Sequence, residues 1–172
     1  MNALLIIDVQ NYFINEISKG LPGKIAGFIE KNKFDFILFS QFFNTLNSFY
    51  YRLHHWDKMF ASPDTDIIPE LGKYVGKENV FKKYKFSVFT AQGFPEYLKL
   101  HYINQLFICG MDTDACIYMS EMEAVEKGYD AKVIKDLSLS QRGNKYHLKG
   151  IELLIKNLGK QSVITSDNYR YP

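Results

Sequence analysis

The feature that most constrains this chain is a series of short segments that are apolar on both faces and separated by longer helical patterns. Segments that are apolar at nearly every position are typical of strands in a parallel sheet with helices on both sides. The chain therefore favours an α/β fold with about six strands. The expected strands are residues 3–7, 34–39, 80–81, 105–109, 131–134 and 162–165.

Helical patterns fill the intervals between these segments. Alternation of strands and helices implies right-handed crossovers and a doubly wound, mainly parallel sheet in a three-layer α/β/α arrangement. A length of 172 residues suits a single domain over residues 1–172. The expected helices are residues 22–31, 42–51, 94–101, 115–127 and 146–157.

Composition narrows the class of partner. The chain has 21 basic and 19 acidic residues, a net charge of +2, which is too balanced to indicate a nucleic-acid or membrane-surface protein. The apolar run 3–7 is too short for a signal peptide, and no run approaches a membrane span. With two cysteines and no recognisable export signal, we expect a cytoplasmic protein.

Polar or special residues end four of the expected strands. They are Asp8, Ser40, Gly110 and Asp136, and Lys83 follows the weak third strand. Ligands of open parallel sheets bind beyond the carboxyl ends of the strands. We therefore expect these residues along one edge of the sheet.

Cys116 is the first candidate for chemistry, because it lies between an expected strand and the clearest helical pattern. Free N–H groups and the positive dipole at a helix start favour a thiolate, and the same N–H groups can hold an oxyanion. The alternative is a buried structural cysteine, which is common for a free thiol. Cys109, inside an apolar run, is expected to be a packing residue.

Asp8 and Lys83 have weaker local signals. A carboxylate directly after five apolar residues suits a proton acceptor at the edge of the sheet, but it also suits a capping role. A lysine near a thiol or carboxylate fixes charge and orientation. Local composition does not separate Lys83 from its neighbours Lys82 and Lys85, which are ordinary surface candidates.

Several spaced motifs resemble those of the isochorismatase-like cysteine hydrolase superfamily, which includes nicotinamidases and N-carbamoylsarcosine amidohydrolases. Residues 3–13 resemble the family's apolar strand followed by D-x-Q-x-x-F. Residues 83–89 resemble its K-x-x-x-S-x-F segment, and residues 108–117 resemble its strand-G-x-x-T-D-x-C-V signature. Residues 66–71 and 123–136 continue the likeness, which covers nearly the whole chain in order.

The resemblance implies a catalytic triad of Asp8, Lys83 and Cys116. In the family mechanism Asp8 takes the thiol proton, Lys83 stabilises the charges, and Cys116 attacks an amide-like carbonyl. The backbone N–H groups of Asp112 and Cys116 hold the oxyanion, and water then hydrolyses the thioester. The resemblance also implies a cis peptide bond between Met111 and Asp112.

Two departures from the family narrow the substrate. Residues 40–44 offer no Asp or His where nicotinamidases carry a metal site, so we expect no metal and no cofactor. Isochorismatases proper lack the cysteine, so Cys116 indicates the branch that cleaves C–N bonds. Aromatic residues with few ionic groups would suit a small uncharged amide. The expected pocket residues are Phe13, Phe42, Trp56 and Met111.

The resulting hypothesis is a cysteine hydrolase that cleaves an amide or carbamoyl C–N bond through a thioester on Cys116. One alternative is a redox or thiol-sensing protein that uses Cys109 and Cys116, although their spacing is unlike a C-x-x-C pair. Another is a non-catalytic scaffold subunit. The resemblance and the 16% aromatic content also suggest a homo-oligomer.

Overall fold

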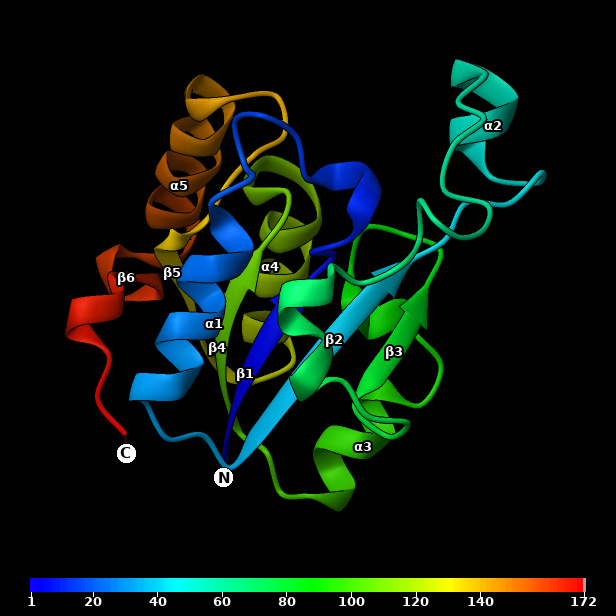
Figure 1. Ribbon diagram of the computed structural model, residues 1–172. Helices are drawn as coiled ribbons and strands as arrows, with labels where there is room; N and C mark the ends of the chain where they lie inside the picture. Colours follow the sequence, from blue (N-terminus) through cyan, green and yellow to red (C-terminus); the bar gives the residue numbers. More distant parts are fainter. Residues whose placement is uncertain (172) are drawn as a thin grey trace.

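The computed structural model describes residues 1–171 and contains one six-stranded sheet in which every pairing is parallel. The strand order is β3-β2-β1-β4-β5-β6, so the chain runs from the centre to one edge and returns to build the other half (Figure 1). This confirms the doubly wound α/β expectation. The strands are β1 (Asn2–Ile7), β2 (Phe36–Phe42), β3 (Val80–Lys83), β4 (Gln105–Gly110), β5 (Asp130–Ser138) and β6 (Val163–Ile164).

Helices cover both faces of the sheet. The α-helices are α1 (Leu21–Lys31), α2 (Phe49–His54), α3 (Phe94–Leu100), α4 (Tyr118–Glu126) and α5 (Asn144–Leu158). Apolar residues of α1 pack in one hydrophobic cluster, and those of α3, α4 and α5 pack in the other. Short helical turns occupy Asn11–Phe13, Pro69–Tyr74, Val88–Thr90, Thr113–Ile117, Lys160–Ser162 and Ser166–Asn168.

Strand β1 shows why the apolar runs have no polar face. Its side chains alternate, so that Leu5 and Ile7 join the cluster beneath α3, α4 and α5, while Leu4 and Ile6 join the cluster beneath α1. All four are completely buried. Burying an aliphatic side chain of this size contributes about 1.5–3 kcal/mol, which explains why residues 3–7 of this central strand are all apolar.

Three predicted element boundaries are wrong: the end of β2, the end of β5 and the start of α4. The helix expected at residues 42–51 is instead the end of β2, a loop and the short helix α2. Strand β2 continues because Phe42 donates its N–H to the side-chain oxygen of Gln10 and accepts from the Gln10 side-chain amide. Asp136 does not end a strand, since β5 continues to Ser138, which pairs with Gly110 after a shift in register.

The helix expected from residue 115 begins differently from the prediction. Residues Thr113–Ile117 form a π-helical turn, and α4 follows it directly. The other helices start and end within two residues of their predicted bounds.

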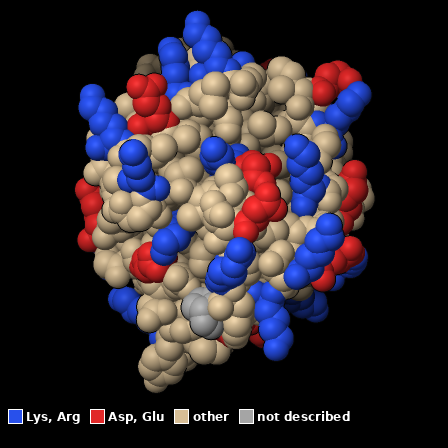
Figure 2. All heavy atoms as spheres, turned by 90° about the vertical axis from the view of Figure 1, so that its left-hand side faces the viewer, with Lys and Arg blue, Asp and Glu red and all other residues tan. Residues whose placement is uncertain are grey.

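The surface has one projecting element. Helix α2 stands away from the sheet at the end where β2 finishes (Figure 1), and none of its six residues is buried. On the face drawn in Figure 2, basic and acidic side chains are interspersed. Across residues 1–171, no helix has the length and apolar character needed to cross a membrane.

Candidate active site

Asp8 follows the last residue of β1 and is almost completely buried. Its φ of 48° lies in the left-handed region, which Asp adopts more readily than most residues. Ser40 of β2 holds it in two ways: the Ser40 hydroxyl donates to Asp8 Oδ1 at 2.6 Å, and the Asp8 N–H donates to Ser40 Oγ at 3.2 Å. The adjacent ends of β1 and β2 therefore orient the carboxylate.

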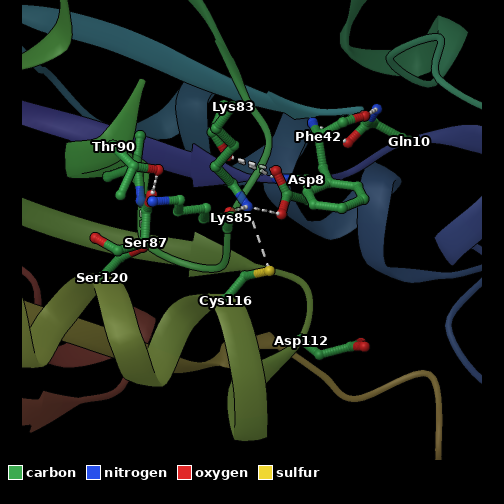
Figure 3. A network of polar contacts seen from close by, with 12 residues as sticks. Asp8, Gln10, Phe42, Lys83, Lys85, Ser87, Thr90, Asp112, Cys116 and Ser120 are labelled. Atoms are coloured by element: carbon green, nitrogen blue, oxygen red, sulfur yellow. Dashed lines mark hydrogen bonds and ion pairs between the residues drawn. The ribbon is translucent and has the colours of Figure 1, made fainter. Parts of the chain in front are cut away.

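Lys83 is the last residue of β3 and is also completely buried. Its ammonium lies 2.6 Å from Asp8 Oδ2 and donates to Cys116 Sγ at 3.3 Å and to the Lys85 carbonyl at 3.1 Å (Figure 3). The Phe42 ring centroid is 5.1 Å away. A buried ammonium needs such partners to offset lost hydration, and two of them are side chains that the sequence predicts for the site, the Asp8 carboxylate and the Cys116 thiol.

Gly110 holds the segment that leads to Cys116 against the end of β1. Gly110 has φ 115°, and a Cβ there would lie 2.2 Å from the Ile7 carbonyl oxygen, so only glycine fits. Met111 N–H donates to the same carbonyl at 2.8 Å. The Met111–Asp112 peptide bond is cis. The segment from Gly110 to Cys116 is thus held directly against the end of β1.

The backbone N–H groups expected to hold an oxyanion lie in this segment. Within residues 1–171 the Asp112 N–H donates to no protein acceptor. Cys116 lies in the π-helical turn that begins at Thr113. The Asp112 carbonyl accepts from both Ala115 and Ile117, each at 3.1 Å, which fixes the turn. One free N–H therefore lies in the segment that carries the thiol.

The electrostatics of Cys116 differ from the expectation of a thiolate favoured by its helix start. Burial raises the pKa of the Cys116 thiol; Lys83 opposes this effect and Asp8 adds to it. Burial alone would lower the pKa of Lys83, but its interactions with Asp8 and Cys116 outweigh this effect, and the pKa is raised. The resting site therefore holds a neutral thiol beside an Asp8–Lys83 ion pair, and the thiol needs a base.

A cavity of about 290 Å³ opens over Cys116. Three of the four predicted pocket residues, Phe13, Phe42 and Trp56, line it. Met111 does not, since its side chain is completely buried in the cluster beneath α1. The full lining is Phe13, Phe42, Tyr50, Trp56, Phe86, Asp112, Ala115, Cys116, Gln141 and Arg142.

Several site residues were not predicted from the sequence: Ser40, the cavity residues Tyr50, Phe86 and Ala115, and the polar pair Gln141 and Arg142. Ser40 was placed at a strand end, but nothing in its local sequence indicated a hydrogen bond to Asp8. Gln141 and Arg142 follow the observed end of β5 at Ser138. Because β5 was predicted to end near Asp136, these two residues were not expected beyond the carboxyl end of a strand, where ligands bind. These two residues give the cavity a more polar wall than the aromatic content suggested.

Other residues with metal-binding or nucleophilic side chains lie apart from Asp8, Lys83 and Cys116. Cys109 belongs to the cluster beneath α1 and Cys116 to the cluster on the opposite face of the sheet, and both thiols are free. His54 and His55 are exposed at the end of α2. Within residues 1–171, no group of three or more His, Cys, Asp or Glu side chains is arranged to hold a metal ion.

Comparison with known sequences identifies the family. The family model described as "Isochorismatase domain" matches residues 2–166. The Bacillus subtilis (strain 168) protein "Uncharacterized isochorismatase family protein YddQ" is 31% identical over 141 residues, 78% of this chain and 75% of that protein. The Xenopus laevis "Isochorismatase domain-containing protein 2" is 31% identical over 74 residues, 43% of this chain but only 35% of that relative.

Solved structures share the fold. An isochorismatase-like hydrolase from Alkaliphilus metalliredigens has a TM-score of 0.84 at 22% identity, covering 98% of this chain and 96% of its own. A pyrazinamidase/nicotinamidase from Streptococcus mutans UA159 has a TM-score of 0.80 at 18% identity, covering 95% and 100%. An N-carbamoylsarcosine amidase from Thermoplasma acidophilum has a TM-score of 0.80 at 17% identity, covering 99% of both chains. At these identities the structures support the fold, and the family match over residues 2–166 shows that this chain belongs to the isochorismatase family.

Proposed function

We propose that this protein is a cysteine hydrolase that cleaves the C–N bond of a small amide or carbamoyl compound through a thioester on Cys116. The observation that carries the proposal is the Lys83 ammonium, which contacts both Asp8 Oδ2 and Cys116 Sγ beneath a cavity. Two of the fold neighbours, from Streptococcus mutans and Thermoplasma acidophilum, are named as amidases, which supports the same reaction class.

In the proposed first step Asp8 accepts the thiol proton as Cys116 Sγ attacks the substrate carbonyl carbon. Lys83 keeps its proton throughout and stabilises the thiolate as it forms. The charge that develops on the carbonyl oxygen is held by the Asp112 N–H and the Cys116 N–H. Fixed donors of this kind typically contribute ~10²–10³-fold in rate.

In the second step the C–N bond breaks and the leaving nitrogen takes the proton held by Asp8. The acyl group remains on Cys116 as a thioester. Asp8, again a carboxylate, then accepts a proton from the water that attacks the thioester, and that proton returns to the departing sulfur. The net reaction adds one water across the C–N bond and restores the neutral thiol.

The dimensions of the cavity limit the substrate to a small molecule. A volume of about 290 Å³ is at the lower end of the range for ligand sites. Phe42 and Trp56 stack with an interplanar angle of 27°, and Tyr12 accepts a hydrogen bond from the Trp56 ring N–H at 3.0 Å. This braced aromatic wall suits a compact, flat substrate body.

The test is a screen of small primary amides and carbamoyl compounds, with released ammonia or amine as the measurement. Native protein is compared with Cys116→Ala, and Cys109→Ala is the matched control because that thiol lies on the other face of the sheet. We expect turnover of at least one compound by native protein and Cys109→Ala, and none by Cys116→Ala. Turnover that survives in Cys116→Ala would contradict the proposal.

The redox alternative has less support. A disulfide needs Cβ atoms about 3.5–4.5 Å apart, whereas Cys109 and Cys116 pack in clusters on opposite faces of the sheet. A scaffold role gives no reason to bury a paired lysine beneath a cavity, because such pairs contribute little net stability. The homo-oligomer and the cytoplasmic location stay predictions, to be checked by light scattering and by fractionation.

A further inference from the structure

We propose that Asp112 is a specificity-determining residue that recognises a hydrogen-bond-donating nitrogen, neutral or cationic, on the substrate and disfavours substrates that carry a carboxylate there. This inference rests on the proposed function, since it concerns the compound that Cys116 attacks. It narrows the substrate from small amides in general to those with a second nitrogen-containing polar group.

The cavity over Cys116 has two unlike walls. One wall is aromatic and comes from the first half of the chain, including Phe42 and Trp56. The other is polar and consists of Asp112, Gln141 and Arg142. A purely apolar substrate would cover the polar wall without adding a hydrogen bond to it. The arrangement therefore favours a ligand with one flat apolar part and one polar group that meets Asp112.

The Asp112 carboxylate is held in one orientation by a single neighbour. The Gln141 backbone N–H donates to Oδ1 at 2.8 Å, and the Gln141 side-chain amide donates to Oδ2 at 3.0 Å. Each carboxylate oxygen can accept more than one hydrogen bond. Asp112 is only 8% exposed, so water has little access to the remaining acceptor sites. A ligand donor in the cavity can satisfy them.

No cationic side chain within residues 1–171 pairs with the Asp112 carboxylate. The cationic side chain on the same wall, Arg142, is engaged elsewhere, with its guanidinium 2.6 Å from Asp114 Oδ2. Within residues 1–171 Asp112 has no ion pair, and both of its hydrogen bonds come from the neutral Gln141. Burial raises the pKa of Asp112 to about 6, which leaves the group mainly ionised at neutral pH. A ligand nitrogen would supply the missing donor, and a ligand carboxylate would be repelled.

The test uses the thiol of Cys116 as a reporter of charge in the cavity. Protein carrying Cys109→Ala is treated with 2-aminoethyl, 2-sulfonatoethyl and methyl methanethiosulfonate, which are cationic, anionic and neutral. Each reagent forms a disulfide on Cys116 and releases methanesulfinate. The rate of each reagent is measured by intact-protein mass spectrometry at pH 7.5 and divided by its rate with 2-mercaptoethanol, which corrects for the reactivity of the reagent itself. The readout is the corrected rate of the cationic reagent divided by the corrected rate of the anionic reagent.

We expect Asp112→Asn to lower this ratio about five- to tenfold, as loss of one charge within several ångströms would do in a partly desolvated site. Asp112→Glu should retain the ratio if it folds with its carboxylate in the cavity, and circular dichroism with thermal melting checks folding. Asp130→Asn is the control for net charge, because Asp130 lies at the amino-terminal end of β5, whereas the cavity lies beyond the carboxyl ends of the strands.

The two proposals fail in different ways. If Asp112→Asn leaves the ratio unchanged, the specificity proposal is wrong. A change in the ratio with Arg142→Gln would then show that Arg142 sets the charge preference of the cavity. If none of the three reagents modifies Cys116 in folded protein, the nucleophile itself is wrong, and the proposed function fails together with this inference.

Discussion

Asp8 and Glu121 are both buried carboxyl groups, but their surroundings are opposite. Asp8 ends β1 beside the cavity and is matched by the Lys83 ammonium and the Ser40 hydroxyl. Glu121 lies in α4, the helix that follows the Cys116 turn, and it is completely buried. Within residues 1–171 neither of its carboxyl oxygens has a hydrogen-bond partner.

The difference separates a buried carboxylate from a buried carboxylic acid. Paired charges keep an ionised group in the interior, whereas an unpaired one takes up a proton instead. Burial raises the pKa of Glu121 to about 9, so it is neutral at pH 7. Burial of a carboxyl group therefore does not mark the active site of this protein. The marks are a compensating cation, a neighbouring nucleophile and access to a cavity.

The largest expected effect comes from breaking the Asp8–Lys83 pair. Lys83→Met removes the cation and leaves Asp8 buried without it, which should destabilise the protein by about 3–5 kcal/mol and abolish turnover. The double variant Asp8→Asn/Lys83→Met should recover most of the stability and none of the activity. Urea denaturation measures the stabilities. Equal stability of the single and double variants would contradict the account of this pair.

Glu121→Gln tests whether Glu121 is a buried, neutral carboxylic acid. The unfolded chain releases the Glu121 proton near pH 4.5 and the folded chain near pH 9, so the native protein loses stability as pH rises between these values. The loss approaches roughly 1.4 kcal/mol per pH unit for one group. The glutamine variant cannot ionise, so its free energy of unfolding should rise relative to that of the native protein by a few kcal/mol from pH 5 to pH 8. Denaturation curves with parallel pH dependence would refute this assignment.

Ser40→Ala is expected to have a smaller effect. It removes the 2.6 Å hydrogen bond to Asp8 Oδ1 and leaves the Lys83 contact in place. The cost should be about 1–3 kcal/mol, the range for a buried acceptor that loses a partner. Activity should fall without being lost, with kcat lowered more than KM, because the carboxylate would be less well oriented. Ser40→Thr, which keeps the hydroxyl, is the matched variant, and an unchanged kcat in Ser40→Ala would exclude a positioning role.

Much of the fold could be predicted because parallel strands buried on both faces must be apolar throughout. The exceptions have local physical causes. The predicted end of β2 is three residues too early, because the last residue of the strand, Phe42, is held by the distant Gln10 side chain. The periodicity of the sequence does not encode this contact. Strand β5 was ended too early because polar residues such as Asp136 are tolerated where the strand lies at the surface.

The site was predicted to a similar depth. Motif spacing singled out Lys83 from a run of lysines, and the structure brings it together with Asp8 and Cys116. Burial in the folded protein raises the pKa of the Cys116 thiol, so a position at a helix start does not by itself predict a thiolate. The Asp112–Gln141 contact joins residues that are 29 apart in the sequence, so no local sequence pattern predicts it.

The most direct test of the central claim, that Asp8 and Lys83 activate Cys116, is the rate of iodoacetamide alkylation followed by peptide mass spectrometry from pH 6 to pH 9. We predict that Cys116 is modified and Cys109 is not, because only Cys116 faces the cavity and Cys109 is completely buried. Asp8→Asn should slow the reaction at Cys116 at pH 7 by removing the proton acceptor. Slow and equal labelling of both cysteines, unaffected by Asp8→Asn, would contradict the account.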